Sequence, residues 1–331
     1  MSAIRSTKEA LVVAVAVGML AGCTGNTGQS GLSPAVNLST LTIRTGIAHA
    51  VRPDHGKSWM SPDGGKKQEY IYVSDFLTND VYVYAYPSGD PMGTLTGFSE
   101  PQGECTQGKN VWIANTSASQ LFEYKLGGTS PVETIIDSGQ YPVSCAYDTK
   151  SGKLAVSNLL TTSGGNGSVS IYTSPSKAPT SYPVTTMTRP YFLGYDTKSN
   201  LFVAGLNASG VYQLAELKKD ANSFRALSVS GATINFPGAV QYADGALAIG
   251  DQLGPSGYPV LYQTKISGST AVVIGTTPLT GSGDAAGCFI LKKEVASPSA
   301  GEIQIYEYPA GGSPVRSFAG PSEPIGTAIV K

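Results

Sequence analysis

The sequence predicts an all-β fold, a six-bladed β-propeller with four-stranded antiparallel blades and a ring closed by its N- and C-terminal strands. A unit of strands separated by polar turns and Pro/Gly breaks recurs about every 40 to 47 residues, the period of propeller blades. Amphipathic helical periodicity is nearly absent. Among 331 residues, 41% are hydrophobic, 14% are charged, 40 are Gly and 21 are Pro. This composition supplies a core and many turns, and one domain of this length is compatible with an all-β fold.

Three strand types recur in each unit. Second strands, which are the most apolar, are expected at 70–75, 111–115, 154–158, 201–205, 247–251 and 294–298. Third strands are expected at 81–86, 120–125, 168–173, 210–216, 259–264 and 302–308. Innermost strands, most of which follow an x-Pro step, are expected at 101–106, 142–148, 190–196, 237–243, 285–291 and 324–330. This spacing predicts six blades.

The two ends of the predicted propeller match each other most clearly. Residues 81–103 align with 303–326, sharing a Tyr-x-Tyr-Pro segment and a Ser-Glu-Pro-x-Gly segment. The match preserves strand alternation and turn residues together, so it indicates a repeat. The last strand, Pro324–Val330, is expected to pair beside Tyr70–Ser74 and close the ring, which would remove exposed sheet edges.

The N-terminus has the layout of an export signal. Arg5 and Lys8 precede an apolar run at 10–20, which is too short to span a membrane. The following Leu20-Ala21-Gly22-Cys23 resembles the bacterial lipobox. That resemblance implies a lipoprotein signal peptide at 1–22 and a lipid, such as palmitate, on Cys23. The alternative is an ordinary signal peptide with an unrelated cysteine.

The lipid would attach the protein to the cell envelope without a spanning helix. Thr24 stands where the lipoprotein family has Asp as its inner-membrane retention signal, which favours the outer membrane where a cell has one. Residues 23–36 are rich in Gly, Ser, Thr and Asn and predict a flexible tether. Residues 37–69 are expected to pack on the propeller as an N-terminal extension, and the propeller itself is expected at 70–331.

The strands Tyr72-Val73-Ser74-Asp75 and Asp80-Val81-Tyr82-Val83-Tyr84 resemble those of the NHL-repeat and SMP-30/gluconolactonase-like propellers. The resemblance covers about residues 70–331 and implies six-bladed architecture. It does not imply an activity, because this superfamily includes lactonases, lyases and pure binding scaffolds.

Few catalytic signatures are present. The Gly-x-Ser-x-Gly elbow is absent, and both histidines, His49 and His55, precede the repeats, which argues against a His-ligated zinc or a His-based triad inside the propeller. The net charge of -1 without a long basic run argues against nucleic acid as a partner. The sequence therefore predicts a monomeric, membrane-anchored binding module for an unknown protein or small molecule. The alternative is a divalent-metal-dependent, lactonase-like hydrolase with its site in the central channel.

Two sets of residues are candidates for a site at one mouth of the channel. The first set follows the second strands and could supply oxygen ligands to Ca²⁺ or another divalent cation, although Asp and Asn more often form turns there. It comprises Asp75, Asn115, Asn158, Asn207 and Asp251. The second set precedes the innermost strands and would form a ligand-binding rim of acids, a base and aromatic residues. It comprises Glu100, Tyr141, Arg189, Phe236, Asp284 and Glu323.

The propeller contains Cys105, Cys145 and Cys288. Cys105 and Cys145 lie on consecutive innermost strands but are one residue out of phase, so their side chains are expected on opposite faces. Buried free thiols are therefore the expectation, and a bridge between Cys105 and Cys145 is the alternative that export would permit.

Overall fold

The computed structural model describes residues 56–62, 69–283 and 286–331. The chain divides into two units, Met1–Ile47 and Ala48–Lys331, and the described residues all belong to the second. The predictions for the signal peptide, Cys23, the tether, both histidines and Asp284 lie outside the described residues.

The described residues form an all-β structure whose only helix is a 3-10 turn at Thr116–Ala118. In no part of the chain that the structure describes is there a helix with the length and apolarity needed to span a membrane.

The first sheet has the order β1 (Trp59–Met60), β4 (Pro91–Leu95), β3 (Asp80–Tyr86), β2 (Glu69–Asp75), β25 (Pro324–Val330). The second is β5 (Pro101–Gln107), β6 (Asn110–Asn115), β7 (Gln120–Lys125), β8 (Glu133–Ile136). The third is β9 (Gln140–Asp148), β10 (Lys153–Thr161), β11 (Asn166–Tyr172), β12 (Thr180–Pro183).

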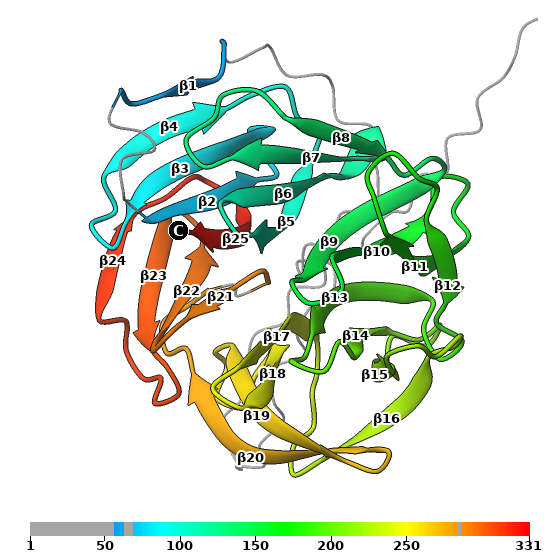
Figure 1. Ribbon diagram of the computed structural model, residues 1–331. Helices are drawn as coiled ribbons and strands as arrows, with labels where there is room; N and C mark the ends of the chain where they lie inside the picture. Colours follow the sequence, from blue (N-terminus) through cyan, green and yellow to red (C-terminus); the bar gives the residue numbers. More distant parts are fainter. Residues whose placement is uncertain (1–55, 63–68, 284–285) are drawn as a thin grey trace, which may run out of the picture. The chain divides into compact units, whose positions relative to one another are not determined.

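A larger sheet has the order β13 (Arg189–Tyr195), β14 (Leu201–Leu206), β15 (Tyr212–Leu217), β16 (Arg225–Ser230), β20 (Thr270–Pro278), β19 (Val260–Ser267), β18 (Ala246–Asp251), β17 (Pro237–Ala243). The last sheet is β21 (Phe289–Leu291), β22 (Glu294–Ser299), β23 (Glu302–Glu307), β24 (Arg316–Ala319). Figure 1 shows the sheets of this unit standing around a common centre, with β25, β5, β9, β13, β17 and β21 innermost.

The eight-stranded sheet consists of two antiparallel four-stranded halves joined at their outer strands. The joint is a short parallel pairing of β16 with β20, from Ser228↔Thr270 to Ser230↔Val272. The sequence did not predict this joint. The first three residues of β20 cover part of the edge of β16, which is one way in which sheets avoid open edges.

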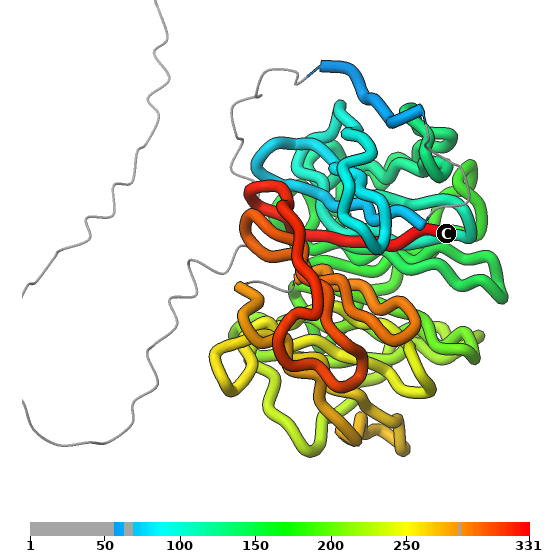
Figure 2. The backbone as a smooth tube through the Cα atoms, turned by 90° about the vertical axis from the view of Figure 1, so that its left-hand side faces the viewer, coloured from blue at the N-terminus to red at the C-terminus, as the bar shows by residue number. Residues whose placement is uncertain are grey.

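Strands from the two ends of the second unit lie side by side. Strand β2 pairs with β25 in antiparallel register from Tyr70↔Val330 to Asp75↔Pro324. Figure 2 shows the C-terminal segment, in red, running beside the blue and cyan start of the sheet. The predicted pairing of Pro324–Val330 with Tyr70–Ser74 is confirmed.

The middle strands are buried on both faces. On β6, Val111 and Ile113 pack into the layer that also contains Tyr70 and Val83, from the first sheet. Trp112, between them, points to the other face and packs with Val156 of the third sheet. A strand that is buried on both faces needs apolar side chains at successive positions. This explains why the second strands are continuous apolar segments in the sequence.

Part of the predicted N-terminal extension is visible as β1. Trp59 pairs with Thr94 and Met60 pairs with Gly93, so β1 adds a fifth strand to the first sheet. Gly93 is needed for this contact, because a Cβ on it would lie 2.5 Å from the Trp59 carbonyl oxygen.

A central cavity as candidate functional site

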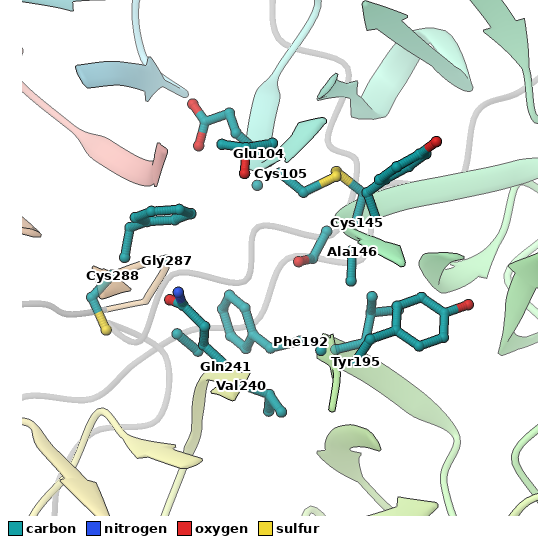
Figure 3. Close-up of a pocket in the computed structure, with 18 of the residues that line it drawn as sticks. Glu104, Cys105, Cys145, Ala146, Phe192, Tyr195, Val240, Gln241, Gly287 and Cys288 are labelled. Atoms are coloured by element: carbon teal, nitrogen blue, oxygen red, sulfur yellow. A yellow bond between two sulfur atoms is a disulfide. The ribbon is translucent and has the colours of Figure 1, made fainter. Parts of the chain in front are cut away.

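The innermost strands enclose a central cavity of about 180 Å³. Its lining includes residues of β5, β9, β13, β17 and β21, together with Thr327 of β25. Figure 3 shows how the labelled lining residues of different sheets converge on one space. The fold alone brings these side chains together, since they come from strands far apart in the sequence.

Among the described residues, Glu104 on β5 is the only acid that lines the cavity. Its Oε1 accepts a hydrogen bond from the Ser74 hydroxyl of β2, and no described residue donates to its buried Oε2. Burial raises the pKa of Glu104 to about 8, although bonds from the Ser74 hydroxyl and from backbone amides act in the opposite direction. With this pKa, Glu104 is mainly uncharged at pH 7. In Figure 3 its carboxyl group points away from the middle of the cavity.

The cavity carries an aromatic side chain where related strands carry small ones. Two residues after the innermost-strand proline stand Gly103, Ser144, Ala239 and Gly326, whereas β13 has Phe192 there. Figure 3 shows the Phe192 ring projecting towards the middle of the cavity. Small residues at this level allow neighbouring innermost strands to approach closely, since a Cβ on Gly103 would lie 2.8 Å from the Val143 carbonyl oxygen. Phe192 is therefore available to offer ring surface to an occupant.

Gln241 of β17 lines the cavity, but both polar atoms of its side chain are bonded to the backbone of Ile290. Its Nε2 donates to the Ile290 carbonyl at 2.7 Å, and its Oε1 accepts from the Ile290 amide at 2.8 Å. This bidentate contact links β17 to β21 in place of a strand pairing.

Cys105 and Cys145 form a disulfide, with Cα atoms 5.5 Å apart. The expectation of free thiols was wrong for this pair. Each sheet turns one face towards the sheet before it and the other face towards the sheet after it. Side chains that point to opposite faces of two adjacent sheets therefore meet in the layer between them, and Cys105 of β5 and Cys145 of β9 lie in this layer with Trp112 and Val156. Cys288 is a buried free thiol, as expected, and burial raises its pKa to about 12.

Loss of this disulfide is expected to lower stability substantially. The bridge closes a loop with a sequence separation of 40, so the double variant Cys105→Ala/Cys145→Ala should lose about 3–4 kcal/mol of unfolding free energy. Denaturant unfolding with and without reductant measures this loss. Cys288→Ala is the matched control, which should retain the full reductant effect. A reductant effect that persists in the double variant would contradict the assignment.

The predicted oxygen-ligand set is mostly bonded to backbone amides. Asp75, Asn207 and Asp251 accept from amides two residues ahead at 2.7, 2.9 and 3.0 Å. Asn115 accepts from the Ser99 amide at 2.6 Å. These contacts support the turn interpretation of the four residues, because their oxygens already have donors.

Asn158 differs from the other four. Its Nδ2 donates to the Ser170 hydroxyl at 2.9 Å, and Ser170 in turn is 3.2 Å from Asp137 Oδ1. The buried Asn158 Oδ1 and Asp137 Oδ2 have no donor within the described part of the chain. Burial also raises the pKa of Asp137. Over the described residues, no group of three or more His, Cys, Asp and Glu side chains is placed to hold a metal ion.

The two predicted sets contact each other rather than act separately. Asp75 Oδ2 accepts from the Glu323 amide at 3.0 Å, and Asp251 Oδ1 accepts from the Phe236 amide at 3.0 Å. Ser299 Oγ accepts from the Gly283 amide in the same way, at 3.2 Å. The polar residue that ends a second strand thus fixes the loop that enters an innermost strand.

The rim residues differ in exposure. Phe236 is buried against Tyr191, with ring centroids 5.9 Å apart, and Glu100 is buried with the Ser117 hydroxyl bonded to its carboxylate. Tyr141, Arg189 and Glu323 are partly exposed. The accessible part of the rim that the structure describes is therefore smaller than the predicted ring.

Sequence reasoning missed Glu104 and Phe192. Both lie inside innermost strands, whereas the predicted rim residues precede those strands. Aligning the strands on their prolines reveals Phe192 as the bulky exception, so the repeat itself contained that signal. Glu104 could not be found in this way, because its burial depends on Ser74 and Gly326 of another sheet.

No protein-family model matches the chain, and no curated protein matches it in sequence. Solved structures do match its fold. A crystal structure of a nidogen/laminin complex gives a TM-score of 0.64 at 11% identity, covering 80% of this chain and 98% of that one. A protein of unknown function from Bacteroides caccae gives 0.59 at 9% identity, covering 80% and 99%. A functionally unknown protein from Desulfotomaculum acetoxidans DSM 771 gives 0.55 at 10% identity, covering 79% and 98%. At these identities the likeness concerns the fold alone, and together with the sheets described above it fits a β-propeller.

Proposed function

We propose that the chain is an exported lipoprotein whose six-bladed propeller is a binding module of the cell envelope, without a catalytic role. The six-blade interpretation treats the eight-stranded sheet as two blades, because its halves share only the short pairing of β16 with β20. The single observation that carries the binding function is the composition of the mouth and cavity. The carboxylates and amides that a hydrolase would need for a metal are mostly bonded to the backbone. Arg189, Glu323 and Tyr141, three members of the predicted rim, are partly exposed, and Nη1 of Arg189 donates to the Thr188 carbonyl at 2.9 Å.

A protein is the partner that we propose for this mouth. Arg189 begins β13, whereas Glu323 directly precedes β25 of another sheet, and the two carry opposite charges, an arrangement that can orient a polar partner. One of the structures that resemble this fold is of a complex between two proteins, nidogen and laminin. The chain itself is proposed to act as a monomer held at the membrane by the lipid on Cys23, with the outer membrane as its place where a cell has one.

Lipid attachment is tested by substitution of Cys23. In a bacterial host that processes lipoproteins, the full-length protein should incorporate labelled palmitate and sediment with membranes. Cys23→Ser should do neither, because the lipidated sulfur is lost. Cys288→Ser is a control that retains Cys23 and should remain labelled. Equal labelling of the Cys23→Ser protein would refute the anchor.

Partner binding is tested by site-specific photo-crosslinking in the same cells. A photoreactive amino acid in place of Arg189 or Glu323 should give a discrete protein adduct. The same amino acid in place of Ile136, which is exposed on outer strand β8, should give none. Adducts at Ile136 but not at the rim would place binding on the outer strands and overturn the proposal for the mouth.

A further inference from the structure

A second cavity, of about 240 Å³, lies between the sheet β5–β8 and the sheet β9–β12. Its lining includes Trp112 of β6, Glu123 of β7, Tyr147 of β9 and Tyr172 of β11. The Thr173-Ser174-Pro175 loop and the Gly152 turn also line it. Pockets for drug-sized ligands measure about 300–1,000 Å³, so this cavity suits a small molecule or a single side chain.

Glu123 is a buried acid without a cation. It is 5% exposed, its Oε1 accepts from Asn110 Nδ2 at 2.7 Å, and no described residue donates to its other carboxylate oxygen. Its cross-strand neighbour on β8 is a second acid, Glu133, and no Lys or Arg of the described chain forms an ion pair with it. Acids that are almost completely buried are usually paired, so this carboxylate can accept a partner of positive charge.

Two of the three aromatic walls offer ring surface rather than hydrogen bonds. Trp112 Nε1 already donates to Gln107 Oε1 at 2.8 Å, and the Tyr172 hydroxyl already donates to Asp137 Oδ1 at 2.9 Å. Trp112 is also the direct cross-strand partner of Glu123, so both side chains lie on the same face of the sheet. A carboxylate beside Trp and Tyr rings is the combination that attracts an organic cation, because the ring faces and the carboxylate are both negative.

We propose that this cavity binds an alkylammonium group, with Glu123 as its counter-ion and hydrogen-bond acceptor and the rings of Trp112, Tyr147 and Tyr172 as its walls. A primary ammonium fits better than a quaternary one, because it has N–H groups that can donate to the Glu123 carboxylate and a quaternary ammonium has none. The group can come from a free amine or from a lysine side chain. This site is separate from the mouth and does not depend on the binding proposed there.

The test uses the full-length protein in detergent, with n-butylammonium as probe and 1-butanol as its neutral isostere. The Trp59→Phe protein serves as the fluorescent form, because the chain has 2 Trp residues and this change leaves Trp112 alone. Calorimetry and Trp112 emission should show saturable binding of butylammonium, with butanol weaker by at least about tenfold. Nα-acetyl-lysine-methylamide distinguishes a free amine from a lysine side chain as the source of the ammonium group. It should bind as tightly as butylammonium only if the cavity admits a lysine side chain that is attached to a peptide backbone.

Glu123→Gln keeps an acceptor for Asn110 and should lower butylammonium affinity by at least about tenfold. Glu133→Gln removes the neighbouring exposed acid and should change affinity by less than about threefold. Equal affinities for butylammonium and butanol, or no saturable binding of either, would overturn the proposal. These two outcomes are measured without the Glu123 substitution, so they decide the question even if that variant folds poorly.

Discussion

Deletion of Pro324–Lys331 is expected to abolish cooperative folding of the whole β unit. The deleted segment contains β25, whose Ala328, Ile329 and Val330 are buried in the layers on both faces of the first sheet. It also removes the pairing of β25 with β2 and the bond from the Thr327 hydroxyl to the Gly287 carbonyl, at 2.7 Å. Full burial of one Ile or Val stabilises by about 1.5–3 kcal/mol, so the summed loss is comparable to the net stability of a typical domain, about 5–15 kcal/mol.

Circular dichroism melting and limited proteolysis measure this effect on the full-length chain and its truncated form. The truncated protein should lose its melting transition and be cut throughout the described sheets, not only at β2. Removal of Lys331 alone is the matched control, because this residue is exposed and follows β25. A truncated protein that melts at the temperature of the full chain would show that the β2–β25 pairing is dispensable.

The local pattern of apolar residues predicted the strands well, because this pattern reflects the burial of each strand on both faces of its sheet. The strands expected at 120–125, 237–243 and 324–330 are observed as β7, β17 and β25 with bounds within one residue. The strand expected at 285–291 is shorter, since β21 begins only at Phe289. Gly287, two residues before β21, forms a parallel bridge with Gly326, so the chain there follows the neighbouring sheet.

The local sequence pattern did not predict the contacts between sheets. The Cys105–Cys145 bridge and the β16–β20 joint both depend on how two sheets face each other, which strand alternation within one sheet does not specify. The same limit applies to Glu123, which sits in an otherwise ordinary third strand, Gln120–Lys125. The cavity that Glu123 lines is formed only together with residues of the facing sheet β9–β12.

Glu104→Gln is expected to change the pH dependence of stability. The pKa of Glu104 is raised from 4.5 to about 8 in the folded protein, mainly by burial. Below pH 4.5 the carboxyl is protonated in both the folded and the unfolded chain, so it causes no pH dependence there. Between pH 4.5 and about 8 the unfolded chain loses this proton while the folded chain keeps it, so the wild-type protein loses stability as pH rises. The whole shift corresponds to a loss on the order of 5 kcal/mol.

The variant lacks this titration, because Gln is uncharged at all these pH values and can still accept from the Ser74 hydroxyl. Denaturant unfolding at pH 5 and pH 9 should therefore show Glu104→Gln gaining several kcal/mol relative to wild type between the two conditions. The raised pKa values of Asp137 and Asp251 act in the same direction in both proteins, so they cancel in this comparison. Exposed Glu307→Gln is the matched control and should run parallel to wild type. If Glu104→Gln also runs parallel, the Glu104 carboxyl ionises in the folded protein as it does in the unfolded chain, and the cavity carries a negative charge at pH 7.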